Sequence, residues 1–146
     1  LRKDFIIDEY QLLESKYYGA DCVLLIIACL SEKKFQSLLE LCKVLNLCAL
    51  VEVHTKEEMQ IALQHNAYLI GINNRNLKTF KVNVDTSVQL AKLKNDNVTF
   101  VSESGLRDKK TIEDLKNKGI DAFLIGESLV TSSNPSNDLR VLVGKC

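Results

Sequence analysis

Two tetrapeptides in the C-terminal half of the chain have the composition of phosphate-binding loops. SESG, residues 102–105, and IGES, residues 125–128, each close an apolar segment and lead towards the start of a helix. Glycine lets the backbone approach a ligand closely, and backbone N–H groups at a helix N-terminus attract anions. Gly105 and Gly126 are also compatible with ordinary turns, and the chain contains neither a P-loop nor a GxGxxG motif.

Two carboxylates lie within segments that otherwise have the composition of buried strands. Glu52 belongs to CALVEV, residues 48–53, and Glu103 belongs to VTFVSES, residues 98–104. A charge buried in such a segment costs on the order of several kcal/mol unless another group pairs with it. Glu52 therefore either serves a functional site or forms a structural ion pair with a lysine of a neighbouring strand. Glu103 repeats the same cost, which favours a functional role for it.

Further polar residues lie at, or just beyond, the C-terminal ends of the apolar segments. The full set is Lys3, Glu52, Asn73, Asn74, Arg75, Glu103, Ser104, Gly105, Gly126, Glu127 and Ser128. Taken singly, Lys3 is compatible with a solvated charge near a chain end, and residues 73–75 are compatible with a polar turn. Their shared position at strand ends makes the whole set a candidate functional site.

The apolar segments alternate with amphipathic helical patterns along the chain. We predict strands over residues 21–28, 48–53, 68–73, 98–104 and 121–126, with residues 1–5 as the end of a sixth. Strand-length runs separated by helices predict βα units and a parallel sheet. A helix is indicated from Ser31, because apolar residues recur at helical spacing up to Leu45.

Local signals mark where several predicted helices begin and end. Residues 55–58 predict a capping box, in which Thr55 accepts from a backbone N–H and Glu58 reaches back to the N-cap. Residues 8–11 give a similar start signal. The remaining predicted N-caps are Asp108 and Ser136, and the predicted helix-ending glycines are Gly19 and Gly119.

The position of the polar residues distinguishes between two parallel α/β folds. In a (β/α)₈ TIM barrel, the C-terminal ends of all the strands converge on one face, where the active site is built. In an open, doubly wound sheet, only the groups at the switch point come together. Five separate strands that each deliver a polar group favour the barrel, whose last two loops often hold a substrate phosphate.

The bulk properties of the chain restrict the classes of protein it can belong to. Its 146 residues fit one domain, and 19 basic residues balance 19 acidic ones, which gives no sign of a nucleic-acid or acidic-membrane partner. The longest apolar stretch, residues 22–30, is too short to span a bilayer. The five cysteines form no CxxC pair, which predicts free thiols and a reducing, cytoplasmic compartment. We predict no metal site, because His54 and His65 lie outside any cluster of ligand residues.

Six segments resemble, in order, the motifs of indole-3-glycerol-phosphate synthase. They are LRKDFIID.YQ, GAD.VLLI, ALVEVH, GINNRNLKTF, VSESG and DAFLIGESL, and the resemblance runs from Leu1 to about Leu142. It implies a TIM-barrel lyase of tryptophan biosynthesis that uses no metal or organic cofactor. Such an enzyme converts 1-(2-carboxyphenylamino)-1-deoxyribulose 5-phosphate to indole-3-glycerol phosphate, with loss of CO₂ and water.

The resemblance also implies a role for each matching residue. Lys3 would be the general acid that protonates the substrate carbonyl oxygen during ring closure. Glu52 would act in acid–base chemistry or stabilise the developing positive charge, with Lys3 as one candidate ion-pair partner. The implied substrate-binding residues are Asn73, Arg75 and Glu103, and the implied phosphate-binding residues are Ser104, Gly105, Gly126 and Glu127.

The resemblance begins at the third strand of the family's barrel. The chain supplies strands three to eight, about six βα units, and has no match to the family's first-strand Lys-x-Ser-Pro-Ser segment, which carries a second catalytic lysine. We interpret residues 1–146 as a single partial barrel domain that lacks the first two units. Turnover by the chain alone is therefore not expected, and a missing N-terminal segment or a fused tryptophan-pathway domain is the expected protein partner.

Two alternative functions stay open at the level of sequence. One is a non-catalytic barrel remnant that only binds a phosphorylated ligand, and the other is a related phosphoribosyl isomerase. The isomerase would require a catalytic cysteine and aspartate at strand ends, whereas Cys48 begins its predicted strand. All three functions imply a small phosphorylated ligand, and none implies a nucleic acid or a membrane.

Overall fold

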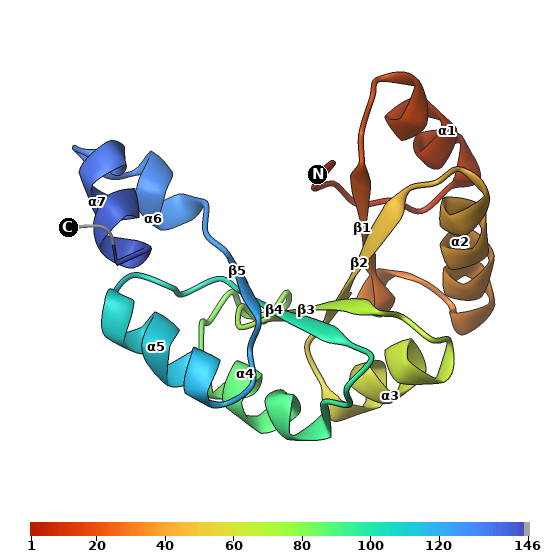
Figure 1. The fold of residues 1–146 in the computed structure, drawn as a ribbon. Helices are drawn as coiled ribbons and strands as arrows, with labels where there is room; N and C mark the ends of the chain where they lie inside the picture. The colour runs from red at the N-terminus through yellow and green to blue at the C-terminus, as the bar shows by residue number, and fades with distance from the viewer. Residues whose placement is uncertain (145–146) are drawn as a thin grey trace. The chain divides into compact units, whose positions relative to one another are not determined.

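A computed structural model describes residues 1–144 of the chain, in which helices alternate with strands (Figure 1). The chain divides into two compact units, Leu1–Gly71 and Ile72–Cys146. The strand order in the sheet is β1-β2-β3-β4-β5. The division falls within β3 (Leu69–Asn73).

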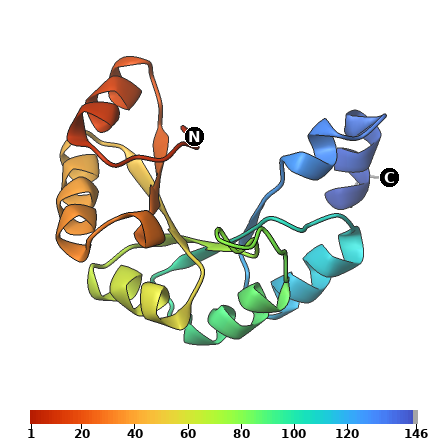
Figure 2. The same ribbon diagram turned by 180° about the vertical axis from the view of Figure 1, so that it is seen from behind.

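The first unit contains two parallel strands and three α-helices. Its elements are α1 (Glu9–Tyr17), β1 (Cys22–Ile26), the 3₁₀ helix η1 (Ile27–Cys29), α2 (Glu32–Val44), β2 (Cys48–Val53) and α3 (Lys56–Gln64). Strands β1 and β2 pair from Cys22 with Cys48 to Ile26 with Glu52. Helices α1 and α2 lie side by side, and α2 packs on both strands (Figures 1 and 2).

The core of the first unit follows from the predicted patterns. The apolar face of α2 is buried, with Phe35 and Leu38 fully enclosed, and it covers strands whose central residues are buried. Burial of a leucine or phenylalanine side chain of this kind stabilises the fold by about 1.5–3 kcal/mol. This packing fixes β2, and with it the position of Glu52 at the C-terminal end of the strand.

The second unit repeats the same alternation. Its elements are α4 (Asp85–Leu90), the 3₁₀ helix η2 (Ala91–Leu93), β4 (Thr99–Glu103), α5 (Lys109–Asn117), β5 (Ala122–Leu124), α6 (Glu127–Val130) and α7 (Pro135–Leu142). Strands β4 and β5 are parallel, with Val101 opposite Ala122 and Glu103 opposite Leu124. Helix α7 packs against both α5 and α6. Phe100 of β4 and Leu115 of α5 are among its most buried side chains.

The predicted strands are confirmed, with shorter bounds at most ends. Residues 48–53 form β2 as predicted, whereas the segment predicted over 21–28 ends at Ile26 and continues as η1. The predicted sixth strand is reduced to one parallel bridge between Arg2 and Val23, in which Arg2 N–H donates to the Cys22 carbonyl at 2.9 Å.

The predicted helix ends are confirmed in most cases and wrong in two. Asp8 and Asp108 are N-caps as predicted, and a capping box joins Asp8 to Gln11. Thr55 caps α3, but the Glu58 carboxylate accepts from the backbone N–H of His54, so the predicted capping box is wrong in its second half. The N-cap of α7 is Asn134 and not Ser136, because Pro135 takes the first helical position, where its missing N–H costs nothing.

The predicted helix-ending glycines and free thiols are also confirmed. Gly19 and Gly119 have φ angles of +81° and +95°, a conformation that glycine adopts without steric cost. Cys22, Cys29, Cys42 and Cys48 are free thiols, and Cys146 lies outside the described residues. Within residues 1–144, no helix has the length and apolar character needed to cross a membrane, and no group of histidine, cysteine and acidic side chains could hold a metal ion.

Candidate functional site

Strand β2 carries Glu52 to its C-terminal end, where the side chain is buried beside Lys3. The Lys3 ammonium nitrogen lies 3.5 Å from Glu52 Oε2, so the hypothesis that Lys3 is an ion-pair partner of Glu52 is confirmed. The Lys3 side chain is 41% exposed, whereas the Glu52 side chain is 1% exposed. The ammonium is therefore accessible to a ligand, while the carboxylate that faces it is shielded from water.

A third charged group, which the sequence reasoning did not include in the site, completes this cluster. His54 follows β2 directly, and its Nε2 lies 3.3 Å from Glu52 Oε1. Its Nδ1 lies 3.2 Å from Glu58 Oε2. Burial lowers the pKa of His54, but the contacts with Glu52 and Glu58 outweigh burial and raise that pKa to about 9. His54 is therefore an imidazolium at neutral pH.

The second unit brings Arg75 and Glu127 together. The Arg75 guanidinium forms an ion pair with the Glu127 carboxylate, and the backbone N–H of Arg75 donates to Asn73 Oδ1 at 3.0 Å. Asn73 is buried at the end of β3. Glu127, a residue predicted to bind phosphate, thus has a cation as its nearest partner. Its charge repels phosphate directly, so it would act on an anion by holding the guanidinium in place.

The loop after β4 has a left-handed backbone and a close neighbour that together favour glycine at residue 105. Ser104 and Gly105 have φ angles of +66° and +76°, and a Cβ atom at residue 105 would lie 2.4 Å from Val82 Cγ1. Left-handed backbone costs a residue other than glycine about 1–2 kcal/mol. Glu103, the last residue of β4, is buried immediately before this turn.

The buried side chain of Asn74 holds the same loop in place through a network of hydrogen bonds. Its amide nitrogen donates to Ser102 Oγ and to the Ser104 carbonyl, both at 3.0 Å. Its amide oxygen accepts from the backbone N–H and the hydroxyl of Ser87, at 3.1 and 2.9 Å. Ser87 is the third residue of α4, whose N-cap, Val84, has no side-chain acceptor. Asn74 therefore caps α4 and fixes Ser104, a role that the sequence reasoning missed.

Gly126 differs from Gly105 in having no conformational requirement. It precedes the short helix α6 with a φ of −121°, and a Cβ atom added there would have no neighbour within 4 Å. The structure thus offers no packing reason for glycine at this position. A role in phosphate binding stays a prediction for Gly126, as it does for Ser104, Gly105 and Glu127.

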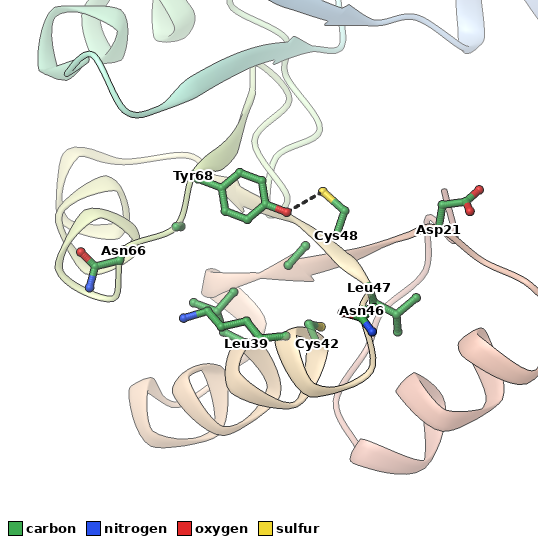
Figure 3. Close-up of a pocket in the computed structure, with 11 residues that line it drawn as sticks. Asp21, Leu39, Cys42, Asn46, Leu47, Cys48, Asn66 and Tyr68 are labelled. Carbon is green, nitrogen blue, oxygen red and sulfur yellow. Dashed lines mark hydrogen bonds between the residues drawn. The ribbon is translucent and has the colours of Figure 1, made fainter.

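A pocket of about 400 Å³ lies at the opposite, N-terminal ends of β1 and β2 (Figure 3). The Tyr68 hydroxyl donates to Cys48 Sγ at 3.2 Å, and Cys42 lines the same pocket. Burial raises the pKa of the Cys42 thiol to about 12. None of the predicted site residues lines this pocket, so it is separate from the Lys3–Glu52 cluster.

Comparisons with known proteins identify one family over nearly the whole chain. The protein-family model described as "Indole-3-glycerol phosphate synthase" matches residues 1–142 of this chain. A relative of that name from Lachnoclostridium phytofermentans is 45% identical over 142 residues, which are 97% of this chain and 52% of the relative. One from Aquifex aeolicus is 48% identical over 146 residues, 99% of this chain and 57% of the relative. The chain thus spans about half the length of the relatives it matches.

Solved structures with little sequence identity share the fold. The chain superposes on 3-hexulose-6-phosphate synthase from Salmonella typhimurium with a TM-score of 0.74 at 16% identity, covering 97% of this chain and 71% of that one. For thiamine phosphate pyrophosphorylase from Pyrococcus furiosus the TM-score is 0.68 at 14% identity, covering 90% and 61%. These likenesses concern the fold alone. They confirm the predicted α/β class, with parallel strands that form part of a TIM barrel.

Proposed function

Because the chain belongs to the indole-3-glycerol phosphate synthase family, we propose that it supplies catalytic residues for that family's ring closure. The proposed substrate is 1-(2-carboxyphenylamino)-1-deoxyribulose 5-phosphate, and the proposed product is indole-3-glycerol phosphate. The observation that supports this most directly is the contact of an accessible ammonium, Lys3, with a shielded carboxylate, Glu52.

The reaction needs a proton donor and a stabilised cation. As an aromatic carbon of the substrate attacks the carbonyl carbon, the carbonyl oxygen must gain a proton, which the exposed Lys3 ammonium can supply. The ring then carries a positive charge until CO₂ leaves. A carboxylate held in a dry site stabilises such a charge better than water does, which is the role we assign to Glu52.

The second unit supplies groups suited to the rest of the substrate. We assign Arg75 to an anionic group, because its guanidinium has donors in a fixed geometry and its ion pair with Glu127 orients it. Asn73 and Glu103 are the other proposed substrate contacts. Ser104, Gly105 and Gly126 are assigned to the phosphate, for which the left-handed turn at residues 104–105 is one supporting feature.

The proposal is tested by following product formation through indole fluorescence. We would assay the chain alone and the chain mixed with a separately supplied segment that carries the family's first two βα units. Lys3→Met and Glu52→Gln should each lower turnover by about 10²–10⁴-fold, the range for loss of a positioned acid or base. Lys33→Met, a change at an exposed lysine of α2, is the matched control and should leave turnover unchanged.

The outcomes separate the enzyme from a binding remnant. Turnover that depends on both Lys3 and Glu52 supports the proposed reaction, whether or not the added segment is required. Binding of inorganic phosphate without turnover in either mixture would favour the non-catalytic remnant. Full turnover by Glu52→Gln in a folded chain would refute the role assigned to the carboxylate.

A further inference from the structure

Four side chains of the first unit form a row of alternating charge. Lys3 contacts Glu52 Oε2, His54 Nε2 contacts Glu52 Oε1, and His54 Nδ1 contacts Glu58 Oε2, at 3.5, 3.3 and 3.2 Å. The two oxygens of Glu52 therefore face two different cations. Because the Lys3 side chain is 41% exposed and the His54 side chain is 11% exposed, His54 is the more deeply buried of the two partners.

The charges around His54 favour a protonated ring. A neutral imidazole has one N–H donor and one acceptor, whereas an imidazolium has two donors. Here each ring nitrogen faces a carboxylate oxygen, so a neutral ring would place one acceptor against another. The imidazolium is thus the form that satisfies both contacts.

Glu58 holds the ring from the side opposite to Glu52. Its Oε2 atom accepts from the backbone N–H of His54 at 2.6 Å as well as facing Nδ1. Glu58 lies in the first turn of α3, which begins directly after Thr55, so its position is fixed by the helix. Glu52 and His54 are two residues apart and therefore project from the same side of the extended chain.

We propose that His54 is a positioning residue for the ring-closure reaction, in which its imidazolium, held by Glu58, keeps the Glu52 carboxylate ionised and aimed at the Lys3 side of the site. This inference rests on the proposed function, since it assumes that Glu52 acts on the substrate. When the Lys3 ammonium donates its proton, Glu52 still has a cation beside it. His54 need not touch the substrate for this effect.

The groups that act on His54 come from each element packed around it. They are Glu52 of β2, Glu58 of α3 and, through Glu52, Lys3 of the N-terminal segment. The Cys29 thiol of η1 lies close enough to both carboxylates for them to raise its pKa further, in addition to burial. The two carboxylates favour the protonated ring up to a pH of about 9, and they outweigh burial, which opposes it; the Lys3 ammonium, being a cation, also opposes it.

A double-mutant cycle tests whether His54 acts through Glu52. His54→Gln keeps a hydrogen-bond donor but loses the charge, and it should lower kcat roughly tenfold while KM stays within about twofold. In a Glu52→Gln background, the same change should have no further effect on kcat, because the group it positions is already gone. His65→Gln is the matched control, since His65 pairs with Glu32 instead. Equal losses in both backgrounds would overturn the proposal.

An NMR titration of the chain separates failure of this inference from failure of the proposed function. The chain has two histidines, so single substitutions assign both imidazoles. The His54 ring should titrate near pH 9, and its midpoint should fall by at least about one unit in Glu52→Gln and in Glu58→Gln. This result supports the pairing even if neither the chain nor its mixture with the added segment shows turnover, in which case the proposed function fails while the pairing of His54 with Glu52 stands. A His54 midpoint that stays below about 7, or is unmoved by Glu52→Gln, overturns the inference.

Discussion

Replacing Asn74 by alanine should destabilise the second unit more than any exposed polar substitution in it. The side chain is 2% exposed and takes part in four hydrogen bonds. Two are donated, to Ser102 and to the Ser104 carbonyl, and two are accepted from Ser87. Alanine removes all four and leaves the space of the amide group empty.

The size of the effect follows from which partners keep another hydrogen bond. A net contribution of about 0.5–1.5 kcal/mol for each bond gives about 2–6 kcal/mol for four. The hydroxyls of Ser87 and Ser102 remain 2.8 Å apart and can bond to each other, and the Ser87 amide also donates to the Val84 carbonyl. The lower part of the range therefore applies, and we expect a loss of about 2–3 kcal/mol in the free energy of unfolding.

The assay is urea unfolding of the chain, followed by circular dichroism, with amide hydrogen exchange at Ser87 as the local measurement. Asn95→Ala is the matched control, because Asn95 is exposed and accepts one bond, from the Asn97 amide. It should change stability by less than about 0.5 kcal/mol. Asn74→Asp keeps the size of the side chain but loses both donors, so it should destabilise at least as much as alanine. A loss below about 0.5 kcal/mol for Asn74→Ala, with unchanged exchange at Ser87, would refute the reasoning.

Three further outcomes are expected. Gly105→Ala should reduce stability by at least about 2 kcal/mol in urea unfolding, because it adds left-handed strain to a steric clash, whereas Gly126→Ala should change it little. Burial raises the pKa of the Cys42 thiol to about 12, so little reactive thiolate is present at pH 8. Cys42 should therefore react with iodoacetamide at pH 8 more than about a hundredfold slower in the folded chain than in urea. Equal rates would contradict its burial. Burial raises the pKa of Asp121, but the hydrogen bond from Lys94 and that from a backbone amide outweigh it and lower the pKa. This carboxylate therefore stabilises the fold above its unfolded pKa of about 3.9, and the contribution disappears as pH falls through the lower folded value. Asp121→Asn should cost less than about 1 kcal/mol at pH 7 and less at pH 2 than at pH 7, measured by urea unfolding at both pH values.

Features that depend on a few neighbouring residues were predictable from the sequence. The start of α1 at Asp8 follows from local hydrogen-bonding types, and the whole of β2 follows from an apolar run that only Glu52 interrupts. Glu52 could be singled out because a charge is anomalous in such a run. The same local logic failed at the start of α7, where Pro135 as the first helical residue outweighed the serine that follows it.

Features that depend on distant residues were not predictable in this way. Helix α4 has no side-chain acceptor at its N-cap, Val84; Asn83 accepts locally from the Asp85 amide, but the acceptor for the Ser87 amide is distant in sequence. The acceptor comes from Asn74, which the sequence places in a polar turn after β3. An asparagine in a turn and an asparagine that caps a distant helix have the same local sequence pattern, and only the packing of the unit distinguishes them.

The cluster around Glu52 shows where a local signal was present but read incompletely. Glu58 follows His54 by four residues across a helix start, and its carboxylate bonds to the His54 amide and faces its ring. A capping-box pattern assigns that carboxylate to the N-cap residue, Thr55, and thereby hides the histidine. Glu52 and His54 are two residues apart in an extended segment, so their side chains project to the same side. The local pattern is therefore a buried carboxylate, a histidine two residues later and a glutamate in the first turn of the next helix. This pattern predicts a paired imidazolium without any long-range information. The same pattern at the end of another parallel strand would predict the same arrangement.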